Sequence, residues 1–334
     1  MNSTMEHPKR IIWLDLLKAL AIFFVIWGHV IHHCGLSIHD YTSVCGWIYS
    51  FHMPLFMTLS GFVSVKLLYG EGSIIRKFNQ LIVPCIVLYL FCLLIGHREN
   101  FWYLKSLFVC YVLIYYYVII KCRYKLPIAI ITCILAFPVV CRVPIVSSWK
   151  IDFMLPFFVL GLILSKNKNR IENNLFTLLL IAVTTFIILW IFWQPSYVWY
   201  ESLPTWFRYG ALISHENSVV NISCIYPVIY RYIIGTAGSL SFILSLWYVF
   251  RRIRNNEFLT KVSGWGGYSL HIYILQSFLV QSDIIPISFP SKNLWIFYGI
   301  YTLIYSIIIF FLCLLLAKFL SKNKYINRFI FGKQ

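Results

Sequence analysis

Residues 9–33, KRIIWLDLLKALAIFFVIWGHVIHH, decide the fold expected for this chain. After a basic pair, a run of about 20 residues is hydrophobic enough to cross a bilayer as a helix. Three ionisable side chains, those of Asp15, Lys18 and His29, lie inside this run. Because a helix turns by about 100° per residue, all three share one face, and Lys18 and His29 lie about 16 Å apart along the axis. The sequence therefore predicts a spanning helix with a polar stripe that reaches two depths of the membrane.

This polar stripe has a structural and a functional interpretation. An ionisable group in a spanning helix costs about 2.5–3.5 kcal/mol on insertion scales, so it usually faces a protein interior or a water-filled cavity. In the structural interpretation, Asp15 and Lys18 form an ion pair, Lys18 reaches the cytoplasmic interface, and His29 is hydrogen-bonded at the outer boundary. The sequence favours a functional stripe for Lys18 and His29 and leaves the role of Asp15 open.

The composition predicts an all-α, polytopic membrane protein. The chain has 334 residues, of which 60% are hydrophobic and 12% charged, and its mean hydropathy is +0.78. The first apolar run is too long for a signal peptide and lacks a small-residue cleavage site, so it is expected to be a true span. We expect one domain over residues 1–334, with a basic cytoplasmic tail at 318–334. About ten spans are predicted, near residues 11–31, 47–67, 79–96, 101–120, 126–141, 151–165, 175–194, 229–250, 268–286 and 294–317.

The distribution of charge predicts the orientation of these spans. Most of the 28 Lys and Arg residues fall in alternate connections, together with both ends of the chain. By the positive-inside rule, both termini are then cytoplasmic. The net charge of +17 is explained by topology and by contact with anionic lipid. We expect no nucleic-acid partner, because the cations are spread over loops and form no basic and aromatic recognition module.

Further histidines lie near the outer end of the first span. His52 enters the membrane in the second span at about the depth where His29 leaves it, which predicts a polar pocket between two helices; an isolated structural histidine is the alternative. His29, His32 and His33 have a spacing that would allow metal ligands on one helix end, but no HExxH-type partner follows. We therefore expect no metal.

Other candidate groups lie at the outer ends of later spans. Trp102 suits the interfacial aromatic belt, and Lys105 either extends to the outer surface or binds a substrate. Asp152 is a candidate counter-charge for Lys105 or Lys150. Glu201 lies in a long aromatic connection whose rings either stack on a sugar or anchor the chain at the interface.

Five sequence stretches together resemble a known family. They are Lys18-x10-His29 within LDLLKALAIFFVIWGHV, then SFHMPLFMTLSGF, a basic loop running into LIVP, FWYLKSLFV, and GYSLHIYIL. This pattern resembles the acyltransferase-3 family of integral-membrane O-acyltransferases, and the sugar O-acetylase branch is nearest. The resemblance implies transfer of an acyl group, commonly acetyl from cytosolic acetyl-CoA, to a carbohydrate or lipid-linked glycan outside the cytoplasm. It also implies membrane lipids as surroundings and the bacterial inner membrane as location.

The resemblance assigns roles to particular residues. His29 is similar to the family's essential histidine, and Lys18 occupies a basic position where the family often has arginine. The loop motif of two basic residues is matched only in part, since Lys77 is present but Gln80 stands at the partner position. Gln276 replaces a histidine that the family has after the tyrosine of the ninth span.

The sequence predicts a site made of three groups of residues, for catalysis, for the acyl donor and for the acceptor. A neutral imidazole is well suited to remove the proton of an alcohol near pH 7, so His29 is the expected base or, alternatively, a transient acyl carrier. A carrier or flippase for a glycolipid is the rival function, with the stripe lining its path. The predicted residues are His29 and His52 for catalysis, Lys18, Asp15, Arg76 and Lys77 for acyl-CoA, and Trp102, Lys105 and Glu201 for the acceptor.

Overall fold

Every regular element in the described part of the chain is a helix. A computed structural model describes residues 11–33, 43–94, 101–123, 149–194, 197, 225–253, 257–280 and 297–333. The helices are α1 (Ile12–His33), α2 (Ser43–Val63), η2 (Val65–Tyr69), α3 (Ile74–Leu94), α4 (Trp102–Arg123), α7 (Ile151–Lys166), α8 (Lys168–Asn173), α9 (Leu175–Ile191), α11 (Ile225–Arg252), α12 (Glu257–Ser263), η5 (Gly264–Tyr268), α13 (Ser269–Leu279), η6 (Phe297–Tyr301), α15 (Thr302–Leu320) and α16 (Lys324–Phe329).

The predicted all-α membrane fold is confirmed. Each predicted span contains a helix, apart from 126–141, which lies outside the described residues. Five helical stretches are long and apolar enough to cross a bilayer: Ile12–His33, Ile74–Leu94, Trp102–Lys121, Tyr226–Arg252 and Gly299–Leu320. The number of ten crossings and the cytoplasmic location of both ends stay predictions.

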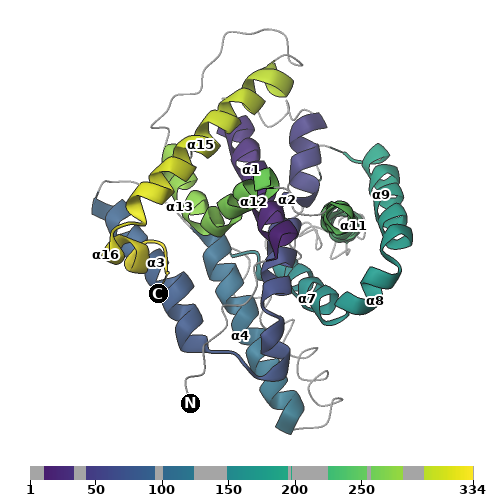
Figure 1. Ribbon diagram of the computed structural model, residues 1–334, viewed down its shortest axis with the longest axis horizontal. Helices are drawn as coiled ribbons and strands as arrows, with labels where there is room; N and C mark the ends of the chain where they lie inside the picture. The colour runs from purple at the N-terminus through teal and green to yellow at the C-terminus, as the bar shows by residue number, and fades with distance from the viewer. Residues whose placement is uncertain are drawn as a thin grey trace, which may run out of the picture.

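Helix α1 lies near the centre of the helical assembly (Figure 1). It contacts α2, α11, α13 and α15, and also α12 and η5. Leu17, Ile22 and Ile26 are fully buried. Other helices therefore cover α1 on several sides, and the ionisable side chains of its polar stripe, Asp15, Lys18 and His29, are partly buried.

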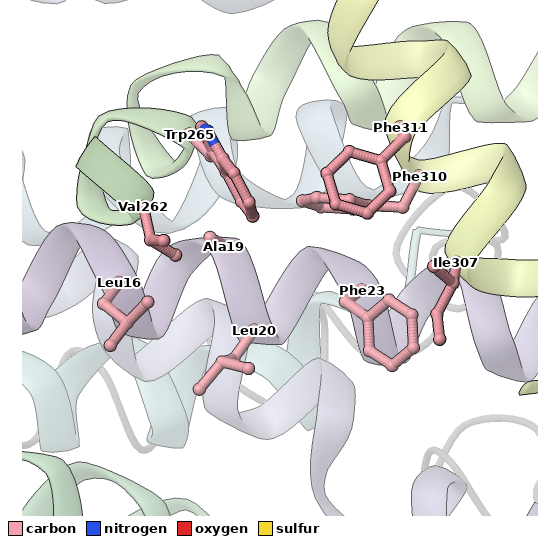
Figure 2. A pocket seen from close by; sticks show the side chains of 9 residues that line it. All are labelled: Leu16, Ala19, Leu20, Phe23, Val262, Trp265, Ile307, Phe310 and Phe311. Atoms are coloured by element: carbon pink, nitrogen blue, oxygen red, sulfur yellow. The ribbon is translucent and has the colours of Figure 1, made fainter. Parts of the chain in front are cut away.

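An apolar cavity of about 170 Å³ borders one face of α1. Figure 2 shows that its walls come from α1, from the segment of α12 and η5, and from α15. The lining residues are Leu16, Ala19, Leu20, Phe23, Val262, Trp265, Ile307, Phe310 and Phe311. None of these side chains titrates near neutral pH, so this cavity offers no group for acid–base chemistry.

Helices α2 and α7 cross with their backbones in contact. A Cβ atom on Gly61 would collide with the carbonyl oxygen of Phe158, and one on Gly161 would collide with that of Thr58. Small residues permit this close approach, which strengthens van der Waals packing between helices in a membrane. Ser60 and Gly61 together give α2 a small surface at this crossing.

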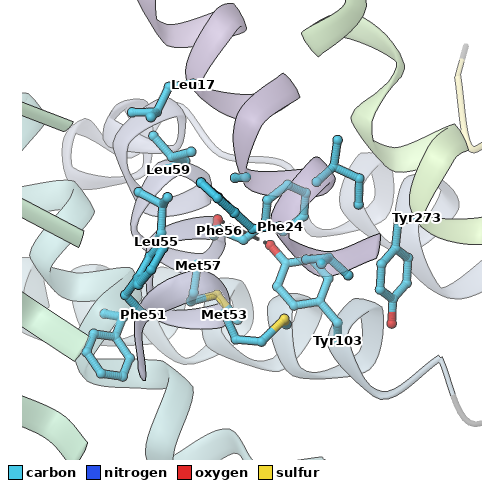
Figure 3. Close-up of a cluster of buried hydrophobic side chains, with 14 of the residues drawn as sticks. Leu17, Phe24, Phe51, Met53, Leu55, Phe56, Met57, Leu59, Tyr103 and Tyr273 are labelled. Atoms are coloured by element: carbon cyan, nitrogen blue, oxygen red, sulfur yellow. Dashed lines mark hydrogen bonds between the residues drawn. The ribbon is translucent and has the colours of Figure 1, made fainter. Parts of the chain in front are cut away.

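The core between α1, α2, α4 and α13 is aromatic (Figure 3). The ring of Tyr103 packs against Phe56, with ring centroids 5.0 Å apart, and against Tyr273 at 5.5 Å. The Tyr103 hydroxyl lies 2.8 Å from the Ser60 Oγ and donates to the Phe56 carbonyl oxygen at 3.4 Å. The buried hydroxyl of Tyr103 therefore has hydrogen-bond partners on α2, and these bonds fix the rotation of α4 against α2.

The outer helices present large apolar side chains on the surface. Leu315 and Phe319 of α15 are 65% and 69% exposed, and Ile191 of α9 is 70% exposed. In water such faces would be unusual, whereas in a bilayer they contact lipid tails at no desolvation cost. The exposure of these apolar side chains therefore agrees with a membrane location.

Candidate functional site

The predicted ion pair between Asp15 and Lys18 is present at one end of the polar stripe. The Lys18 Nζ donates to the Asp15 Oδ1 over 3.0 Å. Their side chains remain 13% and 24% exposed for Asp15 and Lys18, respectively. This end of α1 is therefore partly buried but still accessible, and we call it the Lys18 end.

Helix α3 brings a second lysine to the Lys18 end. The Lys77 Nζ donates to the Gln80 Oε1 at 3.0 Å and lies 5.4 Å from the centre of the Tyr111 ring. Lys77 also interacts electrostatically with Lys18. Arg76 is exposed on the neighbouring position of the helix. Lys77 thus points inward and Arg76 outward, which gives the two predicted donor-binding residues different surroundings.

The segment η5 also packs against the Lys18 end. Gly266 packs on the backbone of Asp15 so tightly that a Cβ atom would collide with the Asp15 carbonyl oxygen. Any residue other than glycine would push η5 away from α1 at this point. The glycine-rich sequence of η5 therefore sets how closely this wall approaches the ion pair.

The other end of the stripe brings together His29 and His52, as the sequence predicted from their depth. The two imidazoles interact electrostatically. Tyr49 joins them, because its hydroxyl donates to the carbonyl oxygen of Gly28 at 3.5 Å and its ring centre lies 4.9 Å from that of His52. A Cβ atom on Gly28 would lie 3.2 Å from the Tyr49 ring, so the glycine before His29 allows this approach. We call this the His29 end.

The hydrogen bond of His52 defines which of its nitrogens is available. Its Nδ1 lies 2.8 Å from the carbonyl oxygen of Ile48, which can only accept a hydrogen bond. Nδ1 therefore carries the proton, and in a neutral imidazole Nε2 is the acceptor. His52 is 3% exposed, so this nitrogen can serve only a group inside the protein.

Arg231 is a buried cation at the His29 end that sequence reasoning missed. It is 2% exposed, and its Nη1 donates to the Tyr49 carbonyl oxygen at 2.7 Å. Its guanidinium also lies over the rings of Phe153 and Trp193, at 5.4 and 5.5 Å. Arg231 interacts electrostatically with His52. Its position inside an apolar span was the available signal, since an intramembrane arginine is rarely placed without a function.

Lys150 contributes a second positive charge beside the histidines. It immediately precedes α7 and interacts electrostatically with both His29 and His52. Burial and the nearby Arg231 guanidinium lower the pKa of Lys150 to about 8. The His29 end therefore combines two imidazoles with two cations, which suits removal of a proton together with stabilisation of a developing negative charge.

The starts of α4 and α7 face each other through two lysine–tryptophan contacts. The Lys150 Nζ lies 4.7 Å from the centre of the Trp102 ring, and the Lys105 Nζ lies 5.6 Å from that of Trp149. Cations near aromatic faces are attracted by the ring quadrupole. Of the predicted acceptor residues, Trp102 is linked to the His29 end through Lys150, and Lys105 contacts the preceding residue, Trp149. Glu201 lies outside the described residues.

The described residues contain no group of three or more His, Cys, Asp or Glu side chains arranged to hold a metal ion. Gln276, which stands where a histidine was expected from the resemblance, is fully buried and donates to the Tyr273 carbonyl oxygen at 3.2 Å. Its side-chain amide N–H groups are therefore bonded within α13 itself.

Comparison with known proteins gives one match. A family model described as an acyltransferase domain matches residues 11–322, which is most of the chain. No curated protein and no solved structure matches. The match begins one residue before α1 and includes both ends of the polar stripe.

Proposed function

This chain belongs to the acyltransferase-3 family of membrane acyltransferases, and we propose that it moves an acetyl or other acyl group from cytosolic acyl-CoA to a hydroxyl of an extracytoplasmic carbohydrate or glycolipid. The sugar O-acetylase branch of the family is the proposed one. The bacterial inner membrane is the proposed location, with both termini in the cytoplasm. Residues 1–334 act as one domain, and residues 318–334 are its cytoplasmic tail.

One observation carries this proposal: a single central helix has a basic group at one end and paired histidines at the other. Lys18 interacts with Lys77, and His29 interacts with His52. The two ends lie about 16 Å apart along the helix axis. A donor held by its phosphates at the Lys18 end can thus reach the His29 end only through an extended arm, which fits a thioester carried on a long pantetheine chain.

The His29 end has the groups that acyl transfer from a thioester requires. His29 removes the proton of the acceptor hydroxyl while its oxygen forms a bond to the acyl carbon. The negative charge then develops on the thioester oxygen, where Arg231 and Lys150 stabilise it. When the bond from carbon to sulfur breaks, the proton on His29 passes to the thiolate, so that a free thiol and an ester are the products. His52 is proposed to position the hydroxyl through its Nε2.

The Lys18 end fits the anionic part of the donor. Lys18 and Lys77 supply positive charge from two helices, and Asp15 orients Lys18 through their ion pair. Arg76 lies exposed beside them and would meet the donor as it arrives from the cytosol. Lysine binds a phosphate as a point charge and lacks the bidentate fork of arginine. Trp102, Lys105 and Glu201 are the proposed contacts of the acceptor on the outer side.

The test is mass spectrometry of cell-surface glycans from cells that carry the wild type, His29→Ala or an empty vector. A mass increase of one acyl group that appears only with the wild type is the expected result. Immunoblots of the membrane fraction establish that both proteins are present in equal amounts. If no acyl group on any glycan or lipid depends on the wild type, the acyltransferase proposal is wrong.

A further inference from the structure

The last residues of the chain form a folded element. Asn323 caps α16, since its side chain accepts hydrogen bonds from the backbone N–H groups of Tyr325 and Ile326 at 2.9 and 3.2 Å. After α16, Gly332 adopts a left-handed backbone conformation with φ of +64°, and the Lys333 N–H donates to the Asn327 carbonyl oxygen at 3.0 Å. Such a glycine ends a helix and redirects the chain.

This C-terminal segment, residues 323–333, is anchored against the helices at the Lys18 end. The ring of Phe331 is fully buried and its centre lies 4.2 Å from that of His271, which is also fully buried. The Asn327 Oδ1 lies 3.4 Å from the Nε2 of the same histidine. Burial of an aromatic side chain stabilises the docked position. The segment therefore has a defined place on the bundle.

Gly332 brings the segment to the helix that carries Lys77. A Cβ atom on Gly332 would collide with the Gln80 carbonyl oxygen, and α16 lies beside α3 (Figure 1). The side chain of Gln80 in turn accepts from Lys77, which interacts with Lys18. On this side, contacts run from the segment to α3, and the charge of Lys77 on α3 acts on Lys18 of α1.

Lys333 brings the segment to η5, which packs against the Lys18 end. Its Nζ lies 5.0 Å from the centre of the Tyr268 ring. Tyr268 ends η5, and Gly266 of the same short helix packs on the Asp15 backbone. The segment is therefore linked to the Lys18 end twice: through α3, whose Lys77 acts on Lys18 by its charge, and through η5, which packs on Asp15.

We propose that residues Asn327–Lys333 form one wall of the acyl-CoA site and that Lys333 binds a phosphate group of the donor. Among the described residues, these elements carry the positive charges of Lys18, Lys77 and Lys333 and the negative charge of Asp15. This excess of cations on three separate elements fits a ligand with several phosphates. The inference rests on the proposed function, because it takes acyl-CoA as the donor.

The test measures the dissociation constant of acetyl-CoA for the purified full-length protein in lipid nanodiscs. Lys333→Ala should weaken binding by about 5-fold or more, because a charge-assisted contact is lost, and Lys333→Arg should restore most of it. The matched control is Lys324→Ala, which removes an exposed lysine from the same segment and should leave binding within about twofold of the wild type.

Phe331→Ala tests the wall itself, since it removes the anchor and leaves Lys333 in place. It should weaken binding by a similar factor, and Lys333→Ala should then add little, because the lysine is already displaced. Unchanged or tighter binding in Lys333→Ala would overturn the inference. If the wild type itself does not bind acetyl-CoA, the assignment of acetyl-CoA as the donor is wrong, and this inference falls with it.

Discussion

The charged groups at the two ends of the polar face of α1 differ in how deeply they are buried. At the Lys18 end, an ion pair stays partly exposed and lysines approach from neighbouring elements. At the His29 end, His52 and Arg231 are almost completely buried, at 3% and 2% exposure. Partly exposed lysines can exchange water for phosphate at little cost, whereas buried groups are held in one arrangement.

This difference predicts two kinds of defect. Substitutions at the Lys18 end should alter the affinity for the donor and leave the rate at saturation largely unchanged. Substitutions at the His29 end should lower the rate at saturation, because they remove interactions made in the transition state. The following variants test this division.

The largest effect is expected for His29→Ala. Loss of the base should lower kcat for acyl transfer by about 10²–10⁴-fold while the KM for acetyl-CoA changes little. Initial rates in membrane vesicles at several acetyl-CoA concentrations measure both constants. The control is His33→Ala, one helical turn further along α1, which should retain activity. A His29→Ala variant with a normal kcat would contradict the assignment of the base.

The next effect is expected for Arg231→Met, which keeps the apolar contacts of the side chain and removes its charge. Loss of one group that stabilises the oxyanion should lower kcat by about 10²-fold. Arg231→Lys should recover part of this loss. The amount of protein in the membrane is measured alongside, because the hydrogen bond to Tyr49 is lost as well. A rate loss that only parallels a loss of protein would assign Arg231 to folding.

Lys18→Ala tests the opposite end and should have a smaller effect. We expect the KM for acetyl-CoA to rise by about 10-fold with kcat within about twofold of the wild type, since a charge-assisted phosphate contact is lost. Lys18→Arg should restore the KM, because arginine keeps the charge and adds a bidentate fork. If kcat falls and KM stays constant, the division between the two ends is wrong.

The smallest effect concerns Lys150 and depends on pH. Because burial and Arg231 lower the pKa of Lys150 to about 8, its positive charge is present at pH 7 and lost as the pH rises through 8. The ratio of kcat for the wild type to that for Lys150→Met should therefore exceed one at pH 7, by less than about 10-fold, and approach one by pH 9. Lys150→Arg should keep its activity above pH 8. A constant ratio would exclude a role for this charge.

The sequence predicted helix positions best where hydrophobicity decides them. The first span was expected at 11–31, and α1 runs from Ile12 to His33. The second was expected at 47–67, whereas α2 begins at Ser43 and ends at Val63. Its polar residues lower its hydropathy, but α1, α7 and α11 cover it, so α2 does not need an apolar surface.

The site was predicted in part. The sequence placed His29 and His52 near each other, because position along a helix fixes the expected depth in a bilayer, and the structure has the two imidazoles interact electrostatically. The position of Arg231 in an apolar span was a signal in the sequence, but its place beside Tyr49 was not, because that requires α11 to pack against α2. The acceptor residue Glu201 lies outside the described residues, and its role stays a prediction.

The sequence by itself determined the membrane location, the helical class and the shared face of Asp15, Lys18 and His29. All three follow from composition and from the rotation per residue within one helix, which are local properties. Only the tertiary structure decided which groups meet that face. The close crossing at Gly61 and the docking of Phe331 depend on contacts between residues far apart in the chain, and such contacts are set by packing.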